Sequence, residues 1–464
     1  MNNSNLNMAF IWRICLVAAC GGLLFGYDWV VIGGAKPFYE AFFNITDPST
    51  SGWAISSALV GCIFGAIISG KMSDKLGRKR TLIISAILFT VSAWGTGWYD
   101  TFSPFVWFRI LGGIGIGIAS GISPIYIAEV SPANIRGKMV AINQLTIVIG
   151  VLAAQLVNLC IADSVPSGAS LSEIASSWNG QMGWRVMFWA ELVPACAFFF
   201  LMFAVPESPR YLSYIGKFEK AEKILERIGG REYAKSTIEE IKVSLRGVQT
   251  QERGNIKDLL NKRYTSVLII GLVLAAFQQW CGINVIFNYA QEIFASAGFD
   301  IDSTLKSIVA TGIINFLATV IALPLVDKLG RRRMMLIGSC GLTIIYALMS
   351  IAYAVGLLGL PVLVLVLIAI AIYALTLAPV TWVLLAEIFP NRIRGIAMSL
   401  ATLSLWVACF LLTYTFPIIN AYLNASGSFA IYGVITTAGF IFILRKVPET
   451  RNLSLEEIEQ KLCK

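Results

Sequence analysis

Three ionisable side chains interrupt long apolar stretches of the sequence: Asp28, Arg109 and Glu191. A charge in apolar surroundings is costly unless it is paired or neutralised by protonation. Arg109 can supply the partner charge for Asp28, and Glu191 offers a second carboxylate. Because the sequence contains no histidine, any group that binds and releases a proton within these stretches must be a carboxylate. The alternative is an ion pair with a purely structural role.

Amide side chains form a second group within the apolar stretches. A carboxamide both donates and accepts hydrogen bonds, so it suits the hydroxyl groups of a neutral ligand. Two tryptophans could add flat apolar faces to such a site, and Gly282 could interrupt the helix that carries three of the amides. The alternative is that the amides bond neighbouring helices and that the tryptophans lie at a lipid interface. The candidate binding residues are Gln144, Gln278, Gln279, Asn284, Asn315, Trp382 and Trp406.

The overall composition indicates where these side chains must lie. Of the 464 residues, 57% are hydrophobic and only 14% are charged, against about 45–50% and about 25% in soluble domains. So few charged residues cannot coat soluble domains of this total length, and the excess apolar surface must face lipid. The composition argues against a soluble enzyme, a nucleic-acid-binding protein and a disordered scaffold.

The long apolar segments predict an all-α membrane protein with twelve transmembrane helices. About 30 Å of hydrocarbon requires roughly 20 apolar residues in a helix that rises 1.5 Å per residue. In the fourth span, Gly113, Gly117 and Gly121 form a stripe of small residues that permits close helix contact. The predicted spans are 10–34, 53–72, 81–99, 104–127, 138–162, 185–205, 265–294, 304–326, 334–355, 360–386, 396–423 and 428–446.

The distribution of Lys and Arg predicts the orientation. Basic residues gather after the even-numbered spans, whereas the opposite loops contain only Lys36 and Lys306. Since cytoplasmic loops collect Lys and Arg, we expect a cytoplasmic (inner) membrane protein with both termini in the cytoplasm. Between the sixth and seventh spans, apolar residues recur at helical spacing among charges of both signs, which predicts short amphipathic helices in a cytoplasmic linker. The predicted domains are 1–205, 206–263 and 264–464.

Three phrases occur once in each half of the chain, in the same order. They are DKLGRKR (74–80) and DKLGRRR (327–333), AEVSPANIRG (128–137) and AEIFPNRIRG (386–395), and, more loosely, PESPR (206–210) and PETR (448–451). Such duplication predicts two six-helix halves related by an axis along the membrane normal, with a binding site between them.

The duplicated phrases, together with PESPRYL at 206–212 and QQWCGINVIFNYA at 278–290, resemble those of the sugar porter family of the major facilitator superfamily. The resemblance covers nearly the whole chain and is strongest to bacterial xylose/proton symporters. It implies the major facilitator fold, sugar transport and alternating access. The chain departs from the family pattern where it has Trp29, Val151, Asn288 and Leu405. These departures leave the sugar open among pentoses and hexoses such as xylose, arabinose, glucose and galactose.

The resemblance also implies an ionic latch on the cytoplasmic side. Carboxylate and guanidinium groups at helix ends can pair, as Glu129 with Arg136 and Glu387 with Arg394. Such latches would hold the two halves together while the site faces outward and would break when it faces inward. The alternative is that the basic residues only keep their loops inside. The latch residues are Asp74, Arg78, Glu129, Arg136, Glu207, Asp327, Arg331, Glu387, Arg394 and Glu449.

By the same resemblance, Asp28 is the residue that couples transport to protons, because proton symporters of this family have Asp at this position and passive facilitators have Asn. A pair with Arg109 would hold Asp28 ionised, and protonation would release Arg109 toward Glu191. We therefore expect a monosaccharide/proton symporter that works as a monomer in the lipid bilayer. We expect no cofactor, no metal site, no catalytic residues and no nucleic-acid partner. The alternatives are a passive sugar facilitator and, in another class, a membrane sugar sensor.

Overall fold

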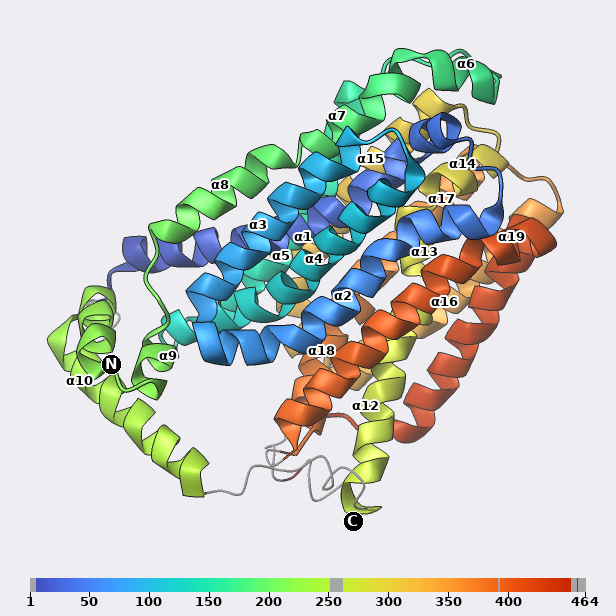
Figure 1. The fold of residues 1–464 in the computed structure, drawn as a ribbon. Coiled ribbons are helices and arrows are strands. Elements are labelled where there is room, and N and C mark those ends of the chain that lie inside the picture. The colour runs from blue at the N-terminus through green and yellow to red at the C-terminus, as the bar shows by residue number, and fades with distance from the viewer. Residues whose placement is uncertain (1–5, 251–261, 391–392, 452–456, 458–464) are drawn as a thin grey trace.

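The computed structural model describes residues 6–250, 262–390, 393–451 and 457, and within these it contains helices and no strand (Figure 1). The all-α prediction is therefore confirmed. The first part of the chain forms α1 (Met8–Phe43), α2 (Pro48–Leu76), α3 (Arg78–Trp98), α4 (Phe102–Val130), α5 (Arg136–Ile161), α6 (Leu171–Ser176), η2 (Asn179–Gly183), α7 (Trp184–Trp189) and α8 (Leu192–Phe203). It is followed by α9 (Pro209–Tyr214) and α10 (Phe218–Thr250). The remainder forms α12 (Lys262–Trp280), α13 (Ile283–Asn288), α14 (Ala290–Ser296), α15 (Ile301–Leu329), α16 (Arg331–Ala354), α17 (Leu360–Leu375), α18 (Leu377–Ile388) and α19 (Arg394–Lys446).

Eleven helices within the described residues are long and apolar enough to cross a membrane. The longest, α19, has 53 residues and as one straight helix would reach about 80 Å, far more than the roughly 30 Å of hydrocarbon. Its backbone leaves the helical conformation at Asn424 (φ 56°, ψ 178°). This break divides α19 where the sequence predicts a loop, and the predicted spans 396–423 and 428–446 lie on either side of it.

The helices form two groups that follow the order of the chain. In Figure 1, α1 to α8 (blue to green) lie on one side of the bundle and α12 to α19 (yellow to red) on the other. We call these groups the N-terminal half and the C-terminal half. Along their boundary α2 packs against α19, α5 packs against α15, and α1 meets both α13 and α14. Any site between the halves must therefore be lined by these helices.

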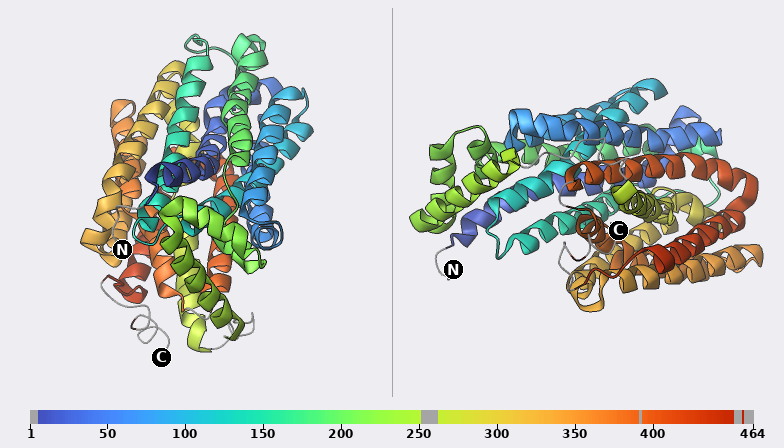
Figure 2. Two further views of the ribbon diagram at one scale, coloured as in Figure 1. Left: turned by 90° about the vertical axis from the view of Figure 1, so that its left-hand side faces the viewer. Right: turned by 90° about the horizontal axis from the view of Figure 1, so that it is seen from below.

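The segment between the halves lies against one end of the bundle, which we call the linker end (Figure 2). The start of α1 is fixed there, because the N–H of Asn7 donates to the carbonyl oxygen of Ile228 at 2.8 Å. Leu225 and Ile228 are buried among charged neighbours, and Gly230 (φ 83°, ψ 177°) divides α10 into two helices. The described part of the predicted linker is thus helical and amphipathic, whereas residues 251–261 lie outside the described residues.

Three predicted spans are interrupted helices. Gly282, in the left-handed conformation (φ 85°, ψ −1°), separates α12 from α13, as its place among the amides predicts. Thr376 (φ −124°, ψ −78°) separates α17 from α18, and Glu191 lies between α7 and α8. The predicted spans 360–386 and 185–205 are therefore present, each built from two shorter helices. Interrupted backbone is tolerated at membrane depth only where protein or a cavity surrounds it, so each break marks a place that faces the interior.

The glycine stripe of α4 brings α2 and α4 into close contact. A Cβ atom on Gly113 would lie 1.8 Å from the carbonyl oxygen of Ala58, and one on Gly117 would lie 2.4 Å from that of Cys62. At Gly121 the nearest atom, Oγ of Ser69, would be 3.7 Å away, which is ordinary contact. The predicted close approach is confirmed at two of the three glycines.

Replacing Gly113 by Ala should destabilise the protein, because the added methyl group would force two helix backbones apart. Overpacking of this kind costs about 1–3 kcal/mol. Gly121→Ala is the matched control, since it adds the same atom on the same helix where there is room. The measurement is the melting temperature of each purified variant in detergent. Equal melting temperatures for the two variants would contradict the close contact.

Candidate functional site

Three of the predicted amides form a hydrogen-bonded chain in the C-terminal half. The side-chain amide of Gln279 donates to Oε1 of Gln278 (2.8 Å), and that of Asn284 donates to Oε1 of Gln279. Gln278 in turn donates to the hydroxyl group of Tyr373 in α17 (2.8 Å). Gln278 and Gln279 are buried. The structure therefore brings Gln278, Gln279 and Asn284 together and adds Tyr373, which the sequence analysis did not identify.

The break at Gly282 makes this amide chain possible. In one continuous helix, Gln278 and Asn284 would be separated by about 240° around the axis, because each residue turns the chain by about 100°. The left-handed conformation of Gly282 turns the chain at the start of α13, so side chains of α13 point in other directions than they would in one continuous helix. Asn284 then returns to the face that carries Gln279. The same flexible glycine that interrupts the helix thus assembles the polar surface.

An aromatic cluster connects the two halves at the candidate site. The ring of Trp406 in α19 lies 6.0 Å, centroid to centroid, from the rings of both Phe25 and Trp29 in α1. Trp406 is buried, and its indole N–H has no partner among the described residues. It can therefore present both a flat face and a free donor to a ligand. Trp382, in α18, is 37% exposed and lies at the surface of this structure.

The other two predicted amides lie on helices that face each other across the boundary. Gln144 is half-buried in α5, and Asn315 is buried in α15. These helices contact each other directly, since Gln155 donates to the hydroxyl group of Thr311 at 3.3 Å. In the part of the chain that the structure describes, hydrogen bonds do not join Gln144 or Asn315 to the amide chain. The structure thus brings together part of the predicted site and leaves these two apart.

Asp28 and Arg109 form the predicted ion pair, between Oδ1 of Asp28 and the guanidinium of Arg109. The exposed fraction is 1% for Asp28 and 2% for Arg109. Arg109 also lies over the ring of Phe188, 5.6 Å from its centroid. Oδ2 of Asp28 and Nε of Arg109 have no hydrogen-bond partner among the described residues. The pair is therefore fully buried yet incompletely satisfied, which is unusual for groups with only a structural role.

Glu191 lies close enough to interact electrostatically with both Asp28 and Arg109. It is buried at the break between α7 and α8, and its Oε1 lacks a partner within the described residues. No hydrogen bond joins it to Arg109 in the described part of the chain. The three residues form one buried group of two carboxylates and one guanidinium. In this structure the guanidinium of Arg109 pairs with Asp28.

Two of the departures from the family pattern meet beside this group. Trp29 and Asn288 line a small cavity of about 10 Å³ together with Arg109. Asn288 is buried, and its Oδ1 has no partner among the described residues. The large ring on α1 thus faces a short side chain on α13. The sequence shows both residues as departures, but only the fold reveals that they are neighbours.

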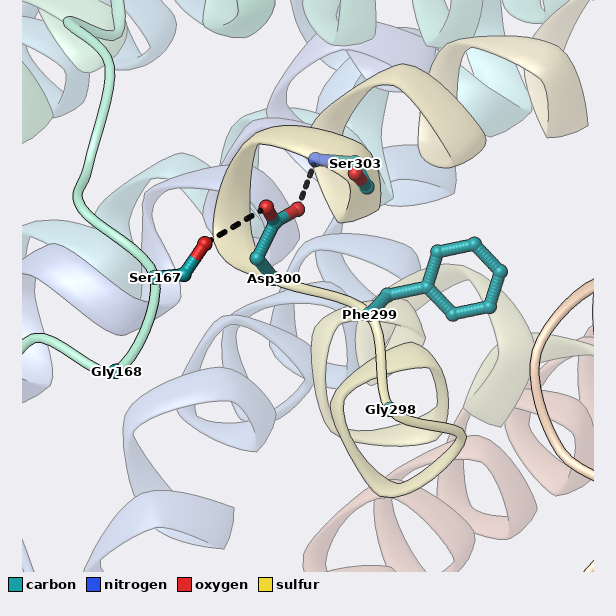
Figure 3. Close-up of a pocket in the computed structure, with 6 residues that line it drawn as sticks. All are labelled: Ser167, Gly168, Gly298, Phe299, Asp300 and Ser303. Atoms are coloured by element: carbon teal, nitrogen blue, oxygen red, sulfur yellow. Dashed lines mark hydrogen bonds between the residues drawn. The ribbon is translucent and has the colours of Figure 1, made fainter.

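A larger hollow, of about 470 Å³, lies away from all these residues at the end opposite the linker (Figure 3). It lies where the loop after α5 meets the start of α15. The hydroxyl group of Ser167 donates to Asp300 at 3.3 Å, and the N–H of Ser303 donates to the same carboxylate at 2.8 Å. This hollow is open, and none of the predicted site residues line it. It is of interest because Ser167 and Asp300, which line it, join the two halves.

At the linker end, the duplicated phrases fold into the same arrangement twice. In the N-terminal half, Arg78 pairs with Glu129 at 3.0 Å and with Asp74 at 3.6 Å. Glu129 also accepts a hydrogen bond from the hydroxyl group of Ser208 (2.5 Å). Glu207 accepts from the N–H of Arg78 at 3.0 Å and so caps the start of α3, where a carboxylate is favoured by the helix dipole.

The C-terminal half repeats three of these contacts. Arg331 pairs with Glu387 at 3.1 Å, and Glu387 accepts from the hydroxyl group of Thr450 at 2.6 Å. Glu449 accepts from the N–H of Arg331 at 2.9 Å and caps α16. The side chain of Asp327 lies outside the described part of the structure. The repeat in the sequence is therefore a repeat of one carboxylate–guanidinium framework.

Glycine is required in both frameworks. Gly77 and Gly330 have φ of +93° and +89°, and a Cβ on them would lie 2.3 Å from Glu207 and 2.8 Å from Glu449. Burial raises the pKa of Glu207, although three backbone N–H groups and Arg78 act in the opposite direction. The cap therefore excludes water as well as closing the turn.

The structure gives Glu129 a different partner from the expected one. Arg136 is exposed, and its Nε donates to the carbonyl oxygen of Ala128 at 3.0 Å. In the second half, Nε of Arg394 donates in the same way to the carbonyl oxygen of Phe389 at 3.0 Å. The described pairs with Arg78 and Arg331 lie within one half each, so the role of the latch between the halves stays a prediction.

Comparison with known proteins agrees with this fold. A family model described as sugar (and other) transporter matches residues 14–462. The D-xylose-proton symporter of Escherichia coli strain K12 is 38% identical over 98% of this chain and 96% of its own length. The arabinose-proton symporter of Bacillus subtilis strain 168 is 36% identical over 98% of this chain and 95% of its own.

Among solved structures, the inward open conformation of the xylose transporter XylE from E. coli matches with a TM-score of 0.84 and 36% identity, over 98% of this chain and 100% of that one. A match of this extent covers both halves and every interrupted helix described above. The chain is therefore a multi-pass membrane protein that belongs to the sugar porter family of the major facilitator superfamily.

Proposed function

We propose that this protein imports a monosaccharide together with protons by alternating access. The observation that carries the proposal is the buried Asp28–Arg109 pair, whose charges lie in the membrane interior with two polar atoms unsatisfied. A carboxylate at this depth that can be neutralised by a proton suits symport better than passive facilitation. The names of the two relatives, a xylose–proton and an arabinose–proton symporter, support the same conclusion.

We propose a neutral pentose or hexose as the substrate. The amides Gln278, Gln279 and Asn284 offer donors and acceptors to hydroxyl groups, and Trp406 offers a ring face and a free N–H. Together these groups match a ring that has hydroxyl groups at its edge and C–H groups on its face. Gln144, Asn315 and Trp382 would complete the site in another conformation.

We propose that the linker end is cytoplasmic, so that both termini lie inside and residues 206–263 form a cytoplasmic linker. The basic loops gathered at that end support this orientation. Residues 1–205 and 264–464 would move as two rigid halves, and the protein would work as a monomer in the bilayer. The similarity to an inward open relative suggests that the described state opens toward the linker end.

The proposed coupling uses the cost of a buried unpaired charge. Protonation of Asp28 would neutralise it and free Arg109, for which Glu191 is the available partner, and this exchange would permit the sugar-loaded transition. One proton entering down 100 mV supplies about 2.3 kcal/mol, which corresponds to roughly fifty-fold sugar accumulation at 1.4 kcal/mol per tenfold.

Uptake of a panel of labelled sugars into transport-deficient cells, with and without a protonophore, tests the class of function. Accumulation that the protonophore abolishes supports symport. Equilibration that the protonophore leaves unchanged would instead show a facilitator. Absence of uptake for every sugar in the panel would favour a sensor.

Gln278→Ala should abolish saturable uptake while the protein still reaches the membrane, because it removes the amide that joins Gln279 to Tyr373 in the chain. Tyr373→Phe is the matched variant: it removes the acceptor of the Gln278 hydrogen bond and keeps the amide. We expect it to retain saturable uptake with weaker affinity. The measurement is initial uptake against sugar concentration at equal protein amounts. An unchanged half-saturation constant for Gln278→Ala would remove Gln278 from the site.

Asp28→Asn should abolish concentrative uptake but keep sugar binding and part of sugar exchange, because an amide can fill the space without releasing a proton. Asp163→Asn, an exposed aspartate outside the helices, is the control and should accumulate sugar normally. The readouts are net uptake with and without a protonophore, and exchange in preloaded vesicles. If Asp28→Asn still accumulates sugar in a protonophore-sensitive way, Glu191 becomes the better candidate.

Arg136→Ala should shift the carrier toward inward-facing states. Arg136 is exposed and bonded to a backbone carbonyl here, so its loss costs this state little and removes the proposed latch of the opposite state. Lys138→Ala, an exposed basic neighbour on the same helix, controls for charge. The measurement is the labelling rate of a cysteine placed on the outer side of the transport path. The latch is excluded if Arg136→Ala and Lys138→Ala are labelled equally.

A further inference from the structure

Lys36 is one of the two basic residues in the predicted outer loops, and the proposed function gives it no role. The structure places it in α1, at the end opposite the linker, with only 2% of its surface exposed. Its ammonium group donates to Glu40 at 2.7 Å and to Glu292 at 2.6 Å. Glu40 lies one turn further along the same helix, whereas Glu292 lies in α14 of the other half. A buried cation therefore joins the two halves.

The surroundings of Lys36 enclose its ammonium group. It lies 5.7 Å from the centre of the ring of Tyr289, and that residue is buried at the start of α14. A buried ammonium group that loses a partner pays a large desolvation penalty. The closed arrangement of this end is therefore strongly favoured only while Glu292 is in contact with Lys36.

Two other hydrogen bonds between the halves at this end are weaker in kind. The N–H of Val165 donates to Asp302 at 3.1 Å, and the hydroxyl group of Ser167 donates to Asp300 at 3.3 Å (Figure 3). These bonds have neutral donors, and Ser167 is exposed. The Lys36–Glu292 contact differs because it joins opposite charges and because its ammonium group is buried, although 25% of the Glu292 side chain is exposed.

We propose that the Lys36–Glu292 ion pair is the outer gate of the transport cycle, which forms when the end opposite the linker closes and breaks when that end opens. This inference rests on the proposed alternation of the two halves. Sugar entering from outside would pass this pair before it reaches the amide chain. Lys36 is thus a residue of the transport reaction itself, although it lies apart from the candidate sugar site.

Glu40 has a distinct role in this gate. Because it is on the same helix as Lys36, it moves with the ammonium group when the halves separate. The i,i+4 pair therefore persists in the open state and keeps Lys36 partnered. Removal of Glu40 should leave the end closed, whereas removal of Glu292 should open it. This difference separates a gate between halves from an ordinary pair within one helix.

The test measures the width of this end with two spin labels, one in each half. The labels are placed at Ser172→Cys in α6 and Ala295→Cys in α14, both exposed, in a chain without its native cysteines. Distances are recorded in nanodiscs without sugar and without a proton gradient. Lys36→Met and Glu292→Gln should each increase the population of long distances at least about tenfold, as expected for breaking a buried pair.

Three further variants make the result decisive. Glu40→Gln and Lys306→Met, the latter an exposed outer lysine, should keep the parental distances. The double variant Lys36→Glu with Glu292→Lys should restore the short distance, since one ammonium group again lies between two carboxylates. Long distances in Glu40→Gln equal to those in Glu292→Gln, or parental distances in both Lys36→Met and Glu292→Gln, would overturn the gate.

The comparison of Glu40→Gln with Glu292→Gln decides the question even if the double variant fails to insert. The distances are recorded without sugar and without a proton gradient, so a failed uptake assay would count against the proposed function and leave the gate standing. Normal uptake together with unchanged distances in the Lys36 and Glu292 variants would count against the gate and leave the proposed function standing.

Discussion

Inside a bilayer there is no water to solvate a charge or a free backbone group, so each must find a partner within the protein or lie in a cavity. This constraint accounts for the buried chemistry of the molecule. Asp28 requires Arg109, Lys36 requires carboxylates, and the break at Gly282 requires surrounding helices. Since Arg109 and Glu292 lie on other helices than the residues they pair with, the constraint also ties the helices to one another. The polar residues both perform the chemistry and hold the bundle in register.

The duplicated framework at the linker end shows the same constraint at the surface of the membrane. In each half, one arginine receives a carboxylate from a neighbouring helix end and also begins a helix that a second carboxylate caps. The two frameworks fasten three helix ends within each half. Helix ends fastened in this way support the proposal that each half moves as a unit, as alternating access requires.

Much of this architecture could be predicted from the sequence. Apolar length predicted the spans, and the duplicated phrases predicted the two halves. The depth of Asp28 and Arg109 predicted their pairing, because a buried charge leaves few alternatives. The break at Gly282 followed from a residue type that readily leaves the helix. In each case a local feature or a strong energetic penalty decided the outcome.

Other features could not be predicted, for a physical reason. That Arg78 rather than Arg136 pairs with Glu129 depends on how the start of α3 approaches the end of α4, and the two arginines look equivalent in the sequence. The contact between Lys36 and Glu292 joins residues 256 positions apart, and Tyr373 reaches Gln278 across 95 positions. Such partners are set by tertiary packing. The positive-inside pattern did single out Lys36 as an exception, but it gave no partner.

The contact between Trp29 and Trp406 has a consequence for the empty carrier. Trp29 directly follows Asp28, and its ring meets that of Trp406 from the opposite half. Aromatic rings in contact leave no space for a chain of water molecules between them. The contact therefore interrupts any water path between these two rings, directly beside the carboxylate that is proposed to carry the proton.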